Sequence, residues 1–242
     1  MINEKVLLHH ARRATQRFLD ILFPPQCAGC KKSGTVLCSS CIANFALSVS
    51  PLCQQCGTPL SAPGICKQCY YHPVGLSGLR TVGTYAGPLR LCIHALKYDG
   101  NVRLAEPLGD ILAKAYLHYG LQADMIIPVP LHHERQQPRG YNHAHLLAEV
   151  CAARINIPLY DHILLRHRPT PAQVGLTANE RHLNVAGAFQ CMPAFTTGAL
   201  LGRRILIIDD VYTTGATLEA CATPLFAAGA QAVWGLVLAR PT

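Results

Sequence analysis

The stretch from Ile205 to Thr217 constrains the fold more than any other part of this chain. It reads I-L-I-I-D-D-V-Y-T-T-G-A-T. Four consecutive aliphatic residues, without polar alternation, are typical of a strand that is buried on both faces of a parallel sheet. A turn rich in threonine and glycine follows, and then a helix-like run over Leu218–Ala228. This order predicts an open α/β sheet with a ligand site at the carboxyl end of the strand.

Two carboxylates and a phosphate-binding turn are predicted at that end. Backbone N–H groups at a helix start, beside threonine hydroxyls, can bind a phosphate, and Gly215 lets the backbone approach the anion closely. We expect Asp209 and Asp210 at the exposed end of the strand, where they accept hydrogen bonds from sugar hydroxyls. The alternative is structural, because an acidic turn can also cap the helix or pair with Arg203 or Arg204.

The same stretch resembles the 5-phosphoribosyl-1-pyrophosphate (PRPP) motif of type I phosphoribosyltransferases. The resemblance implies that Asp209 and Asp210 bind the ribose hydroxyls. It also implies that the turn binds the 5-phosphate, through Thr213, Thr214, Gly215, Ala216 and Thr217. Tyr212 departs from the family pattern, which usually has an aliphatic residue at this position.

Length and composition limit the class of protein. The 242 residues, half of them hydrophobic, suffice for one sizeable α/β domain and a smaller unit. No apolar run approaches the roughly 18 residues that span a bilayer, and charged residues interrupt the first 23, unlike a signal peptide. We therefore expect a cytoplasmic protein without membrane insertion. The net charge of +8 and pI near 9.0 favour anionic partners, either phosphates or nucleic acid.

Residues 1–23 predict an amphipathic helix that ends before Pro24 and Pro25. Its apolar stripe consists of Leu7, Ala11, Ala14, Phe18 and Ile21. We expect this helix to pack on the rest of the chain. A helix that lies on a membrane surface is the alternative, but it would need a more aromatic apolar face.

Residues 24–78 contain four C-x-x-C pairs, enough for two tetrahedral zinc sites. The eight thiols are Cys27, Cys30, Cys38, Cys41, Cys53, Cys56, Cys66 and Cys69. A cytosolic chain keeps such thiols reduced, which disfavours disulfides. We expect the first four to bind one zinc and the last four another; an interleaved arrangement, in which the first pair joins the third, is the alternative. The segment is too short to bury much core, so the metal would supply its folding energy.

Residues 79–242 predict a parallel, doubly wound α/β domain. Unbroken apolar strands alternate with helical patterns, which favours parallel strands with crossover helices. We predict strands over Arg80–Tyr85, Met125–Val129, Ile155–Leu159, Ile163–Arg166 and Ala232–Leu238. Helices are predicted over Leu89–Tyr98, Leu104–Tyr119 and Ala144–Arg154, the last capped by Asn142. Cys92, Cys151, Cys191 and Cys221 have apolar neighbours and are interpreted as core thiols.

Two loops of this domain are candidates for chemistry. The first leaves the strand at Met125–Val129 on the same sheet edge as the central motif, and it is basic and rich in histidine. In phosphoribosyltransferases a loop at this place holds pyrophosphate; here it would use Val129, Pro130, Leu131, His132, Arg135 and Arg139. A solvated basic loop is the alternative. The second, Arg168–Arg181, is a long connection that would suit a lid over an activated donor.

Nearly the whole chain after Pro24 resembles the ComF family of predicted amidophosphoribosyltransferases. Zinc knuckles precede a phosphoribosyltransferase core in that family. The shared motifs are H-A-L-K-Y at His94–Tyr98, P-V-P-L-H at Pro128–His132, R-G-Y-N at Arg139–Asn142 and Q-V-G-L at Gln173–Leu176. The resemblance implies a type I phosphoribosyltransferase-like fold, preceded by a small Cys-rich zinc-binding domain, with PRPP and Mg²⁺ as ligands. The family is associated with DNA uptake.

Two hypotheses of function follow. In the first, the protein is a phosphoribosyltransferase that displaces pyrophosphate from PRPP with a nitrogen nucleophile, with Mg²⁺ bridging pyrophosphate and sugar oxygens. No residue stands out as a general base: His132 or His133 could serve, but the chain has twelve histidines, and no motif indicates the acceptor. In the second, the fold is a non-catalytic module that binds PRPP or single-stranded DNA and acts with a DNA-uptake helicase.

Overall fold

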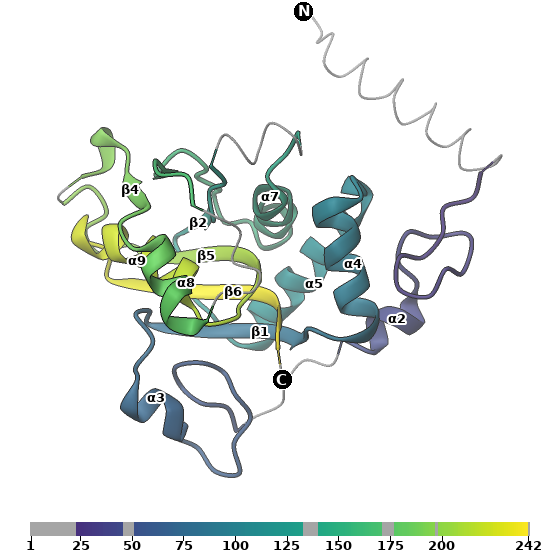
Figure 1. The fold of residues 1–242 in the computed structure, drawn as a ribbon, viewed down its shortest axis with the longest axis horizontal. Coiled ribbons are helices and arrows are strands. Elements are labelled where there is room, and N and C mark those ends of the chain that lie inside the picture. The colour runs from purple at the N-terminus through teal and green to yellow at the C-terminus, as the bar shows by residue number, and fades with distance from the viewer. Residues whose placement is uncertain (1–22, 46–50, 133–139, 171–176, 197, 242) are drawn as a thin grey trace, which may run out of the picture.

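The computed structural model describes residues 23–45, 51–132, 140–170, 177–196 and 198–241. Its centre is a parallel four-stranded sheet with the strand order β1-β6-β5-β2 (Figure 1). The strands are β1 (Gly78–Thr84), β2 (Met125–Pro128), β5 (Arg204–Val211) and β6 (Ala232–Arg240). The aliphatic run of the central motif forms β5, which is buried along its length between β6 and β2. The predicted parallel α/β sheet is confirmed.

Helices cover both faces of the sheet, as a doubly wound arrangement requires (Figure 1). Alternate residues of β5 point to opposite faces. Leu206 and Ile208 belong to the core under α4 (Gly87–Tyr98), α5 (Ala105–His118) and α7 (His143–Ile155). Ile205 and Ile207 belong to the core under α9 (Ala216–Ala227), on which α8 (Ala178–Val185) packs. This double burial explains why the run contains no polar residue.

Two of the expected strands are wrong or placed differently. Ile155 ends α7, and Asn156 caps the helix in the left-handed conformation, so no strand forms over Ile155–Leu159. Leu159 makes only an isolated bridge to Ile126. The strand expected over Ile163–Arg166 is β3 (Leu164–Arg166), which pairs antiparallel with β4 (Phe189–Cys191) in a separate two-stranded sheet. Short apolar runs do not reveal which sheet a strand will join.

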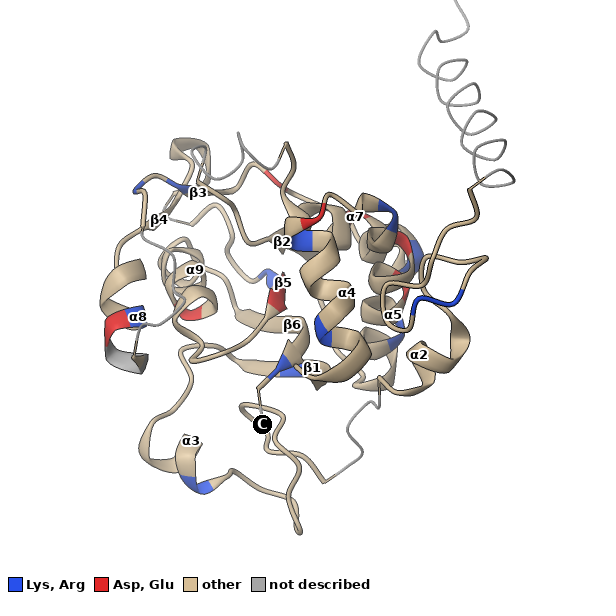
Figure 2. Cartoon of the chain, turned by 45° about the vertical axis from the view of Figure 1, so that its right-hand side comes forward, with Lys and Arg blue, Asp and Glu red and all other residues tan. Residues whose placement is uncertain are grey.

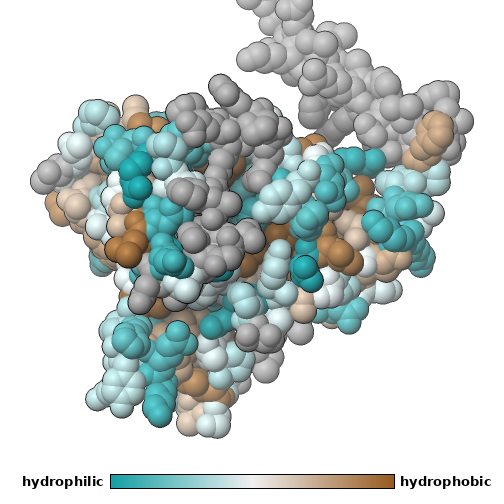
Figure 3. All heavy atoms as spheres, viewed as in Figure 1, coloured by the Kyte–Doolittle hydropathy of each residue, from teal (hydrophilic) through white to brown (hydrophobic). Residues whose placement is uncertain are grey.

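The remaining elements are short. The turn of 3₁₀-helix η1 (Val102–Leu104) leads into α5, and η2 (Pro193–Phe195) follows β4. The cysteine-rich segment contains α2 (Ser39–Ala43) and α3 (Lys67–Tyr71), which lie on different sides of the sheet domain (Figure 1). Hydrophilic and hydrophobic residues are interspersed over the face of the described residues seen in Figure 3.

Three of the four isolated cysteines are core thiols, since Cys92, Cys151 and Cys221 are fully buried. Cys191 is half-buried, and its thiol donates to the carbonyl of Pro224 at 3.4 Å. Among the described residues, no helix is long and apolar enough to cross a membrane. The predicted N-terminal helix over residues 1–23 lies almost entirely outside the described residues and stays a prediction.

Candidate functional site

The carboxyl ends of β2 and β5 lie side by side. Pro128 is paired with Ile208, and the N–H of Val129 donates to the carbonyl of Ile208 at 3.0 Å. The loop after β2 therefore begins directly beside Asp209 and Asp210 (Figure 2, red at the end of β5). The two stretches that the sequence placed at one sheet edge do meet there.

The acid pair, Asp209 and Asp210, is buried, which corrects the expectation of carboxylates at an exposed strand end. The two residues are 9% and 3% exposed. Each carboxylate accepts a backbone N–H, that of Asp210 at 2.9 Å and that of Val211 at 2.8 Å. The suggested pairing with Arg204 is also wrong, because Arg204 forms its ion pair with Asp124 at 2.7 Å.

Two nitrogen-bearing side chains face the acid pair from the helices above it. Lys97 Nζ lies 2.5 Å from Asp210 Oδ2. His143 Nε2 lies 3.6 Å from the same oxygen and 3.8 Å from Asp209 Oδ1. Lys97 is near the end of α4 and His143 is the first residue of α7. The hydroxyl of Tyr141 donates to the carbonyl of Leu96, which ties these two helix ends together.

The charges of this cluster are set by burial and by mutual contact. Burial, reinforced by the neighbouring Asp210 carboxylate, raises the pKa of Asp209 to about 7. Burial opposes ionisation of Asp210 too, but Lys97 and His143 hold its pKa well below the usual range. Burial disfavours the charge on Lys97, yet the two carboxylates raise its pKa. Near neutral pH, Asp210 is thus ionised beside a charged Lys97, and Asp209 is close to its midpoint.

The turn after the acid pair combines a left-handed glycine with two threonines. Gly215 caps α9 in the left-handed conformation with φ 91°. A Cβ there would lie 2.8 Å from the ring of Tyr212, so both the conformation and the space require glycine. Thr214 Oγ1 accepts the N–H of Ala216 at 3.4 Å, and the side chain of Thr213 is exposed. The turn therefore presents backbone N–H groups and hydroxyls at the start of a twelve-residue helix.

The residue that departs from the motif, Tyr212, has a packing role. Its ring is buried against Gly215, and the guanidinium of Arg240 lies 5.8 Å from the ring centre. Its N–H donates to the carbonyl of Ala239 at 2.9 Å, which fixes the turn to β6. Burial raises the pKa of this tyrosine to about 12, so the ring stays neutral. An aromatic residue at this position thus supports the turn.

The loop after β2 is described at its two ends. Val129 and His132 are buried, whereas Pro130 and Leu131 are half-buried. Asn142 joins the ends, because its amide donates to the carbonyl of Val129 at 3.0 Å while its oxygen caps α7. The other predicted residues of this loop, His133, Arg135 and Arg139, lie outside the described residues, as does the whole Q-V-G-L motif at Gln173–Leu176.

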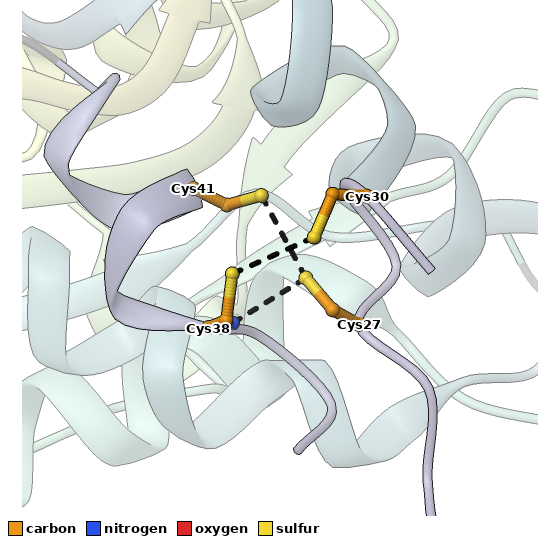
Figure 4. A group of neighbouring side chains, drawn as sticks. All are labelled: Cys27, Cys30, Cys38 and Cys41. Atoms are coloured by element: carbon orange, nitrogen blue, oxygen red, sulfur yellow. Dashed lines mark hydrogen bonds between the residues drawn. The ribbon is translucent and has the colours of Figure 1, made fainter. Parts of the chain in front are cut away.

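The eight clustered cysteines form two groups, in the sequential arrangement and not the interleaved one. Within each group the sulfurs lie within 4.8 Å of one another. In the first, Cys27 and Cys41 are 3.7 Å apart and Cys30 and Cys38 are 3.6 Å apart (Figure 4). The first group consists of Cys27, Cys30, Cys38 and Cys41, and the second of Cys53, Cys56, Cys66 and Cys69.

The geometry of both groups fits zinc. Four sulfurs bound tetrahedrally at about 2.3 Å from zinc lie about 3.8 Å from one another, close to the spacings found. Backbone N–H groups also point at sulfur, from Cys38 to Cys27 at 3.4 Å and from Cys66 to Cys53 at 3.3 Å. Although burial opposes it, such N–H groups lower the pKa of Cys27 to about 6. The two groups are consistent with two structural zinc ions.

The second cysteine group borders the turn after the acid pair, whereas the first does not. A cavity of about 530 Å³ lies between the second group and this turn. Cys56 and Cys69 line it on one side, and Thr213 and Thr214 line it on the other. Arg240 fixes this wall, because its guanidinium donates to the carbonyl of Cys56 at 3.1 Å and to the hydroxyl of Thr58 at 2.7 Å. The first group instead packs in the core shared with α4.

The acid pair fits a divalent cation poorly. His143, Asp209 and Asp210 bring three ligand atoms within 4.8 Å of one another. However, the ammonium of Lys97 already contacts the carboxylate oxygen of Asp210 that lies nearest to His143. Mg²⁺ prefers oxygen ligands and waters in octahedral geometry, which a buried histidine and an ion-paired carboxylate do not supply.

Comparison with known proteins identifies the family. The chain is 35% identical over 211 residues to DNA utilization protein YhgH of Escherichia coli O157:H7, covering 84% of this chain and 90% of that protein. The chain belongs to the ComF family. Competence protein F of Haemophilus influenzae is 32% identical over 88% of this chain and 90% of its own length. Competence protein ComFC of Bacillus subtilis is 29% identical over 81% of this chain and 80% of its own length.

The double zinc ribbon domain model matches residues 18–70, which include both cysteine groups. Among solved structures, a glutamine PRPP amidotransferase from Bacillus subtilis is similar over 60% of this chain and 30% of that one. Its TM-score is 0.40 and its sequence identity 20%. A purine phosphoribosyltransferase from Pyrococcus horikoshii has a TM-score of 0.32 and 18% identity over 56% of this chain and 82% of its own. TM-scores this low carry no functional argument.

Sequence reasoning missed Lys97 and His143 as site residues. Lys97 lies in the H-A-L-K-Y motif, which was assigned no role, and His143 directly follows R-G-Y-N, of which only Arg139 and Asn142 were assigned one. A usable signal was present, because Lys97 comes four residues after the apolar Ile93 and therefore lies on the same face of the helix. The sequence does not reveal the distance between Lys97 and the acid pair, since nothing in it indicates that the end of α4 reaches over β5.

Proposed function

We propose that this ComF-family protein binds PRPP at the carboxyl ends of β2 and β5 and acts in the use of imported DNA. One observation carries the proposal: the acid pair at the end of β5 is followed at once by a left-handed glycine that caps α9. Acids for sugar hydroxyls and a helix start for phosphate thereby follow one another at the carboxyl end of the same strand. The similarity to competence and DNA utilization proteins supports the biological role.

In this proposal the described residues have separate tasks. Asp209 and Asp210 accept hydrogen bonds from the ribose hydroxyls. The turn holds the 5-phosphate through its backbone N–H groups and the hydroxyls of Thr213 and Thr214. The loop that begins at Val129 holds the diphosphate, with any Mg²⁺ carried on the diphosphate and not on the acid pair.

In the same proposal, the protein consists of a zinc-binding segment, residues 24–78, and a phosphoribosyltransferase-like domain, residues 79–242, and it works in the cytoplasm.

The proposed reaction is transfer of the phosphoribosyl group to a nitrogen nucleophile, with release of pyrophosphate. The new C–N bond forms at the anomeric carbon as the bond to the diphosphate oxygen breaks, and the nucleophile loses a proton. Orientation and stabilisation of the leaving diphosphate would supply most of the rate. Of the two histidines that could serve as the base, His132 is among the described residues and is 4% exposed.

Calorimetry with PRPP tests the proposal. Wild-type protein should bind one PRPP per chain, and Asp209→Asn should weaken binding about ten- to hundredfold, because a charge-assisted hydrogen bond is worth roughly 1.5–3 kcal/mol. Circular dichroism of the same samples separates loss of binding from loss of fold. Wild-type protein that is folded, contains zinc and shows no heat of PRPP binding would refute the site. Pyrophosphate release with candidate amines then decides whether turnover occurs.

A second candidate function is a non-catalytic module that binds single-stranded DNA and acts with a DNA-uptake helicase. One observation favours it: α3 of the second cysteine group exposes Tyr70 and Tyr71, 73% and 65% exposed, next to Lys67. Exposed aromatic rings beside positive charge suit stacking with unpaired bases. Salt-dependent binding of single-stranded DNA that Tyr70→Ala with Tyr71→Ala abolishes, without pyrophosphate release from PRPP, would favour this function.

A further inference from the structure

The cluster around the acid pair contains its own counter-cation. Asp210 Oδ2 is contacted by Lys97 Nζ at 2.5 Å, and the Lys97 side chain is only 24% exposed. The carboxylate of Asp210 is 4% exposed, so this ion pair is shielded from bulk water. Two unit charges this close attract each other more strongly at a shielded site than in water. The charge of Asp210, one of the two carboxylates that would attract a divalent cation, is therefore already balanced from within the chain.

The fold holds Lys97 in this place. Its helix, α4, buries Cys92, Ile93 and Leu96 against the sheet domain. The carbonyl of Leu96 accepts the hydroxyl of Tyr141, just before α7 begins. The backbone on which Lys97 stands is thus fixed from two directions, by apolar packing and by a hydrogen bond. A lysine on a mobile loop would not give the acid pair a permanent neighbour.

The acid pair, with His143, offers the ligand atoms of a metal site but lacks the free negative charge of one. His143, Asp209 and Asp210 place three ligand atoms within 4.8 Å, yet Asp210 is already ion-paired. A divalent cation would have to displace an ammonium group and accept a histidine, which Mg²⁺ binds reluctantly. Sugar hydroxyls make no such demand, because each needs only an acceptor and a carboxylate oxygen offers more than one lone pair.

We propose that Lys97 is a positioning residue that replaces a divalent metal ion at the acid pair, so that Asp209 and Asp210 receive sugar hydroxyls without recruiting free Mg²⁺. Lys97 keeps Asp210 ionised and oriented, and Asp209 provides the second acceptor. The metal part of this proposal concerns the protein alone. Only the sugar part rests on the proposed function.

Manganese titration tests the metal part, with paramagnetic Mn²⁺ as the probe and the zinc-containing full chain as the sample. Wild-type protein and Lys97→Arg should bind no Mn²⁺ at the acid pair. Lys97→Met, which keeps an apolar stem of similar length but removes the charge, should gain a site with at least tenfold higher affinity for Mn²⁺. Adding Asp210→Asn to Lys97→Met should remove the gained site, which locates it at the acid pair.

Two results would overturn the proposal. One is a Mn²⁺ site in wild-type protein that Asp210→Asn abolishes, because the acid pair would then bind metal despite Lys97. The other is a folded Lys97→Met that gains no site, because the lysine would then not be what excludes the metal. If Lys97→Met does not fold, the wild-type and Asp210→Asn titrations still decide, since wild-type protein must show no site that Asp210→Asn removes.

A ligand measurement separates this inference from the proposed function. Ribose 5-phosphate has the hydroxyls and the phosphate but no diphosphate to carry Mg²⁺. Its affinity for wild-type protein should change less than twofold between magnesium-free buffer and millimolar Mg²⁺. In Lys97→Met its binding should become dependent on Mg²⁺, and Lys97→Arg should restore independence. Absence of ribose 5-phosphate binding would refute the proposed function, whereas strong Mg²⁺ dependence in wild-type protein would refute only the role of Lys97.

Discussion

The acid pair and the phosphate turn are neighbours in the sequence, yet they differ in how they are prepared for a ligand. Asp209 and Asp210 are buried and already in contact with Lys97 and His143. The turn, by contrast, is fixed by Gly215 and opens onto a cavity. A ligand can therefore enter the turn as it stands, but it must share the acid pair with groups that belong to the fold.

The acid pair and the turn also depend on different cysteine groups. The first group shares a core with α4, the helix that carries Lys97 to the acid pair. The second lines the cavity beside Thr213 and Thr214 and is held by Arg240. Two similar metal-binding modules thus support the two halves of one site, so each half can be perturbed through its own module.

Loss of one zinc should have the largest effect and should separate the modules. A structural zinc contributes about 10–16 kcal/mol, as much as a whole domain's stability, so each module should unfold without its metal. Cys66→Ser should weaken ribose 5-phosphate binding more than tenfold, because it removes a wall of the cavity. Cys30→Ser should chiefly lower the melting temperature of the α/β domain, because its module packs on α4.

Elemental analysis is the control for that pair of variants. Wild-type protein should contain about two zinc ions per chain and each variant about one. Freshly purified wild-type protein with well under one zinc would contradict the metal assignment. Suppose that Cys30→Ser weakens ribose 5-phosphate binding as much as Cys66→Ser, while the α/β domain is as stable in both variants as in wild-type protein. The two cysteine groups would then not support separate halves of the site.

Asp210→Asn should lower the unfolding free energy by about 3–5 kcal/mol, because it leaves the largely shielded Lys97 without the buried carboxylate that it contacts. The matched change at the turn, Thr213→Val, should cost less than about 0.5 kcal/mol, since the side chain is exposed. Urea unfolding of both variants measures the difference. Equal and small losses would mean that the acid pair is as independent of the fold as the turn.

The sequence allowed the turn to be predicted better than the acid pair. Local rules govern the turn, because Gly215 and the threonines act on their own backbone and on the helix that follows. The burial of Asp209 and Asp210 depends instead on α4 and α7, which begin far away in the chain. The aliphatic run likewise predicted β5 correctly, whereas the expected strand over Ile155–Leu159 is absent because one left-handed residue, Asn156, ends α7 there.

Gly215→Ala should destabilise the turn by about 1–3 kcal/mol, because a left-handed non-glycine residue is strained. Its Cβ would in addition press on the ring of Tyr212 at 2.8 Å. Gly202→Ala is the matched control, since Gly202 also has a positive φ, 71°, but no atom within 4 Å of the added Cβ. Thermal unfolding of both variants isolates the contact with Tyr212. Equal losses would show that the ring does not support the turn.

Asp209→Asn should change the pH dependence of stability. Because the pKa of Asp209 is raised to about 7 in the folded protein, the folded state keeps a proton that the unfolded state releases near pH 4. Wild-type stability should therefore fall as pH rises from about 4 to 7, with the full penalty present above pH 7. The variant lacks this penalty, so its advantage over wild type should grow from pH 5 to pH 8 in urea unfolding. A constant difference would mean that Asp209 is ionised throughout.

Thr214→Val should have the smallest effect, on ligand binding alone. The hydroxyl of Thr214 accepts the N–H of Ala216 and faces the cavity, but the backbone N–H groups of the turn stay in place without it. We expect ribose 5-phosphate affinity to fall about two- to tenfold, corresponding to a net hydrogen bond of roughly 0.5–1.5 kcal/mol. Thr223→Val, an exposed position further along α9, is the matched control and should change nothing. A loss far beyond tenfold at Thr214, with unchanged stability, would mean that side chains and not the backbone hold the phosphate, and that the turn is less preformed than the contrast with the acid pair implies.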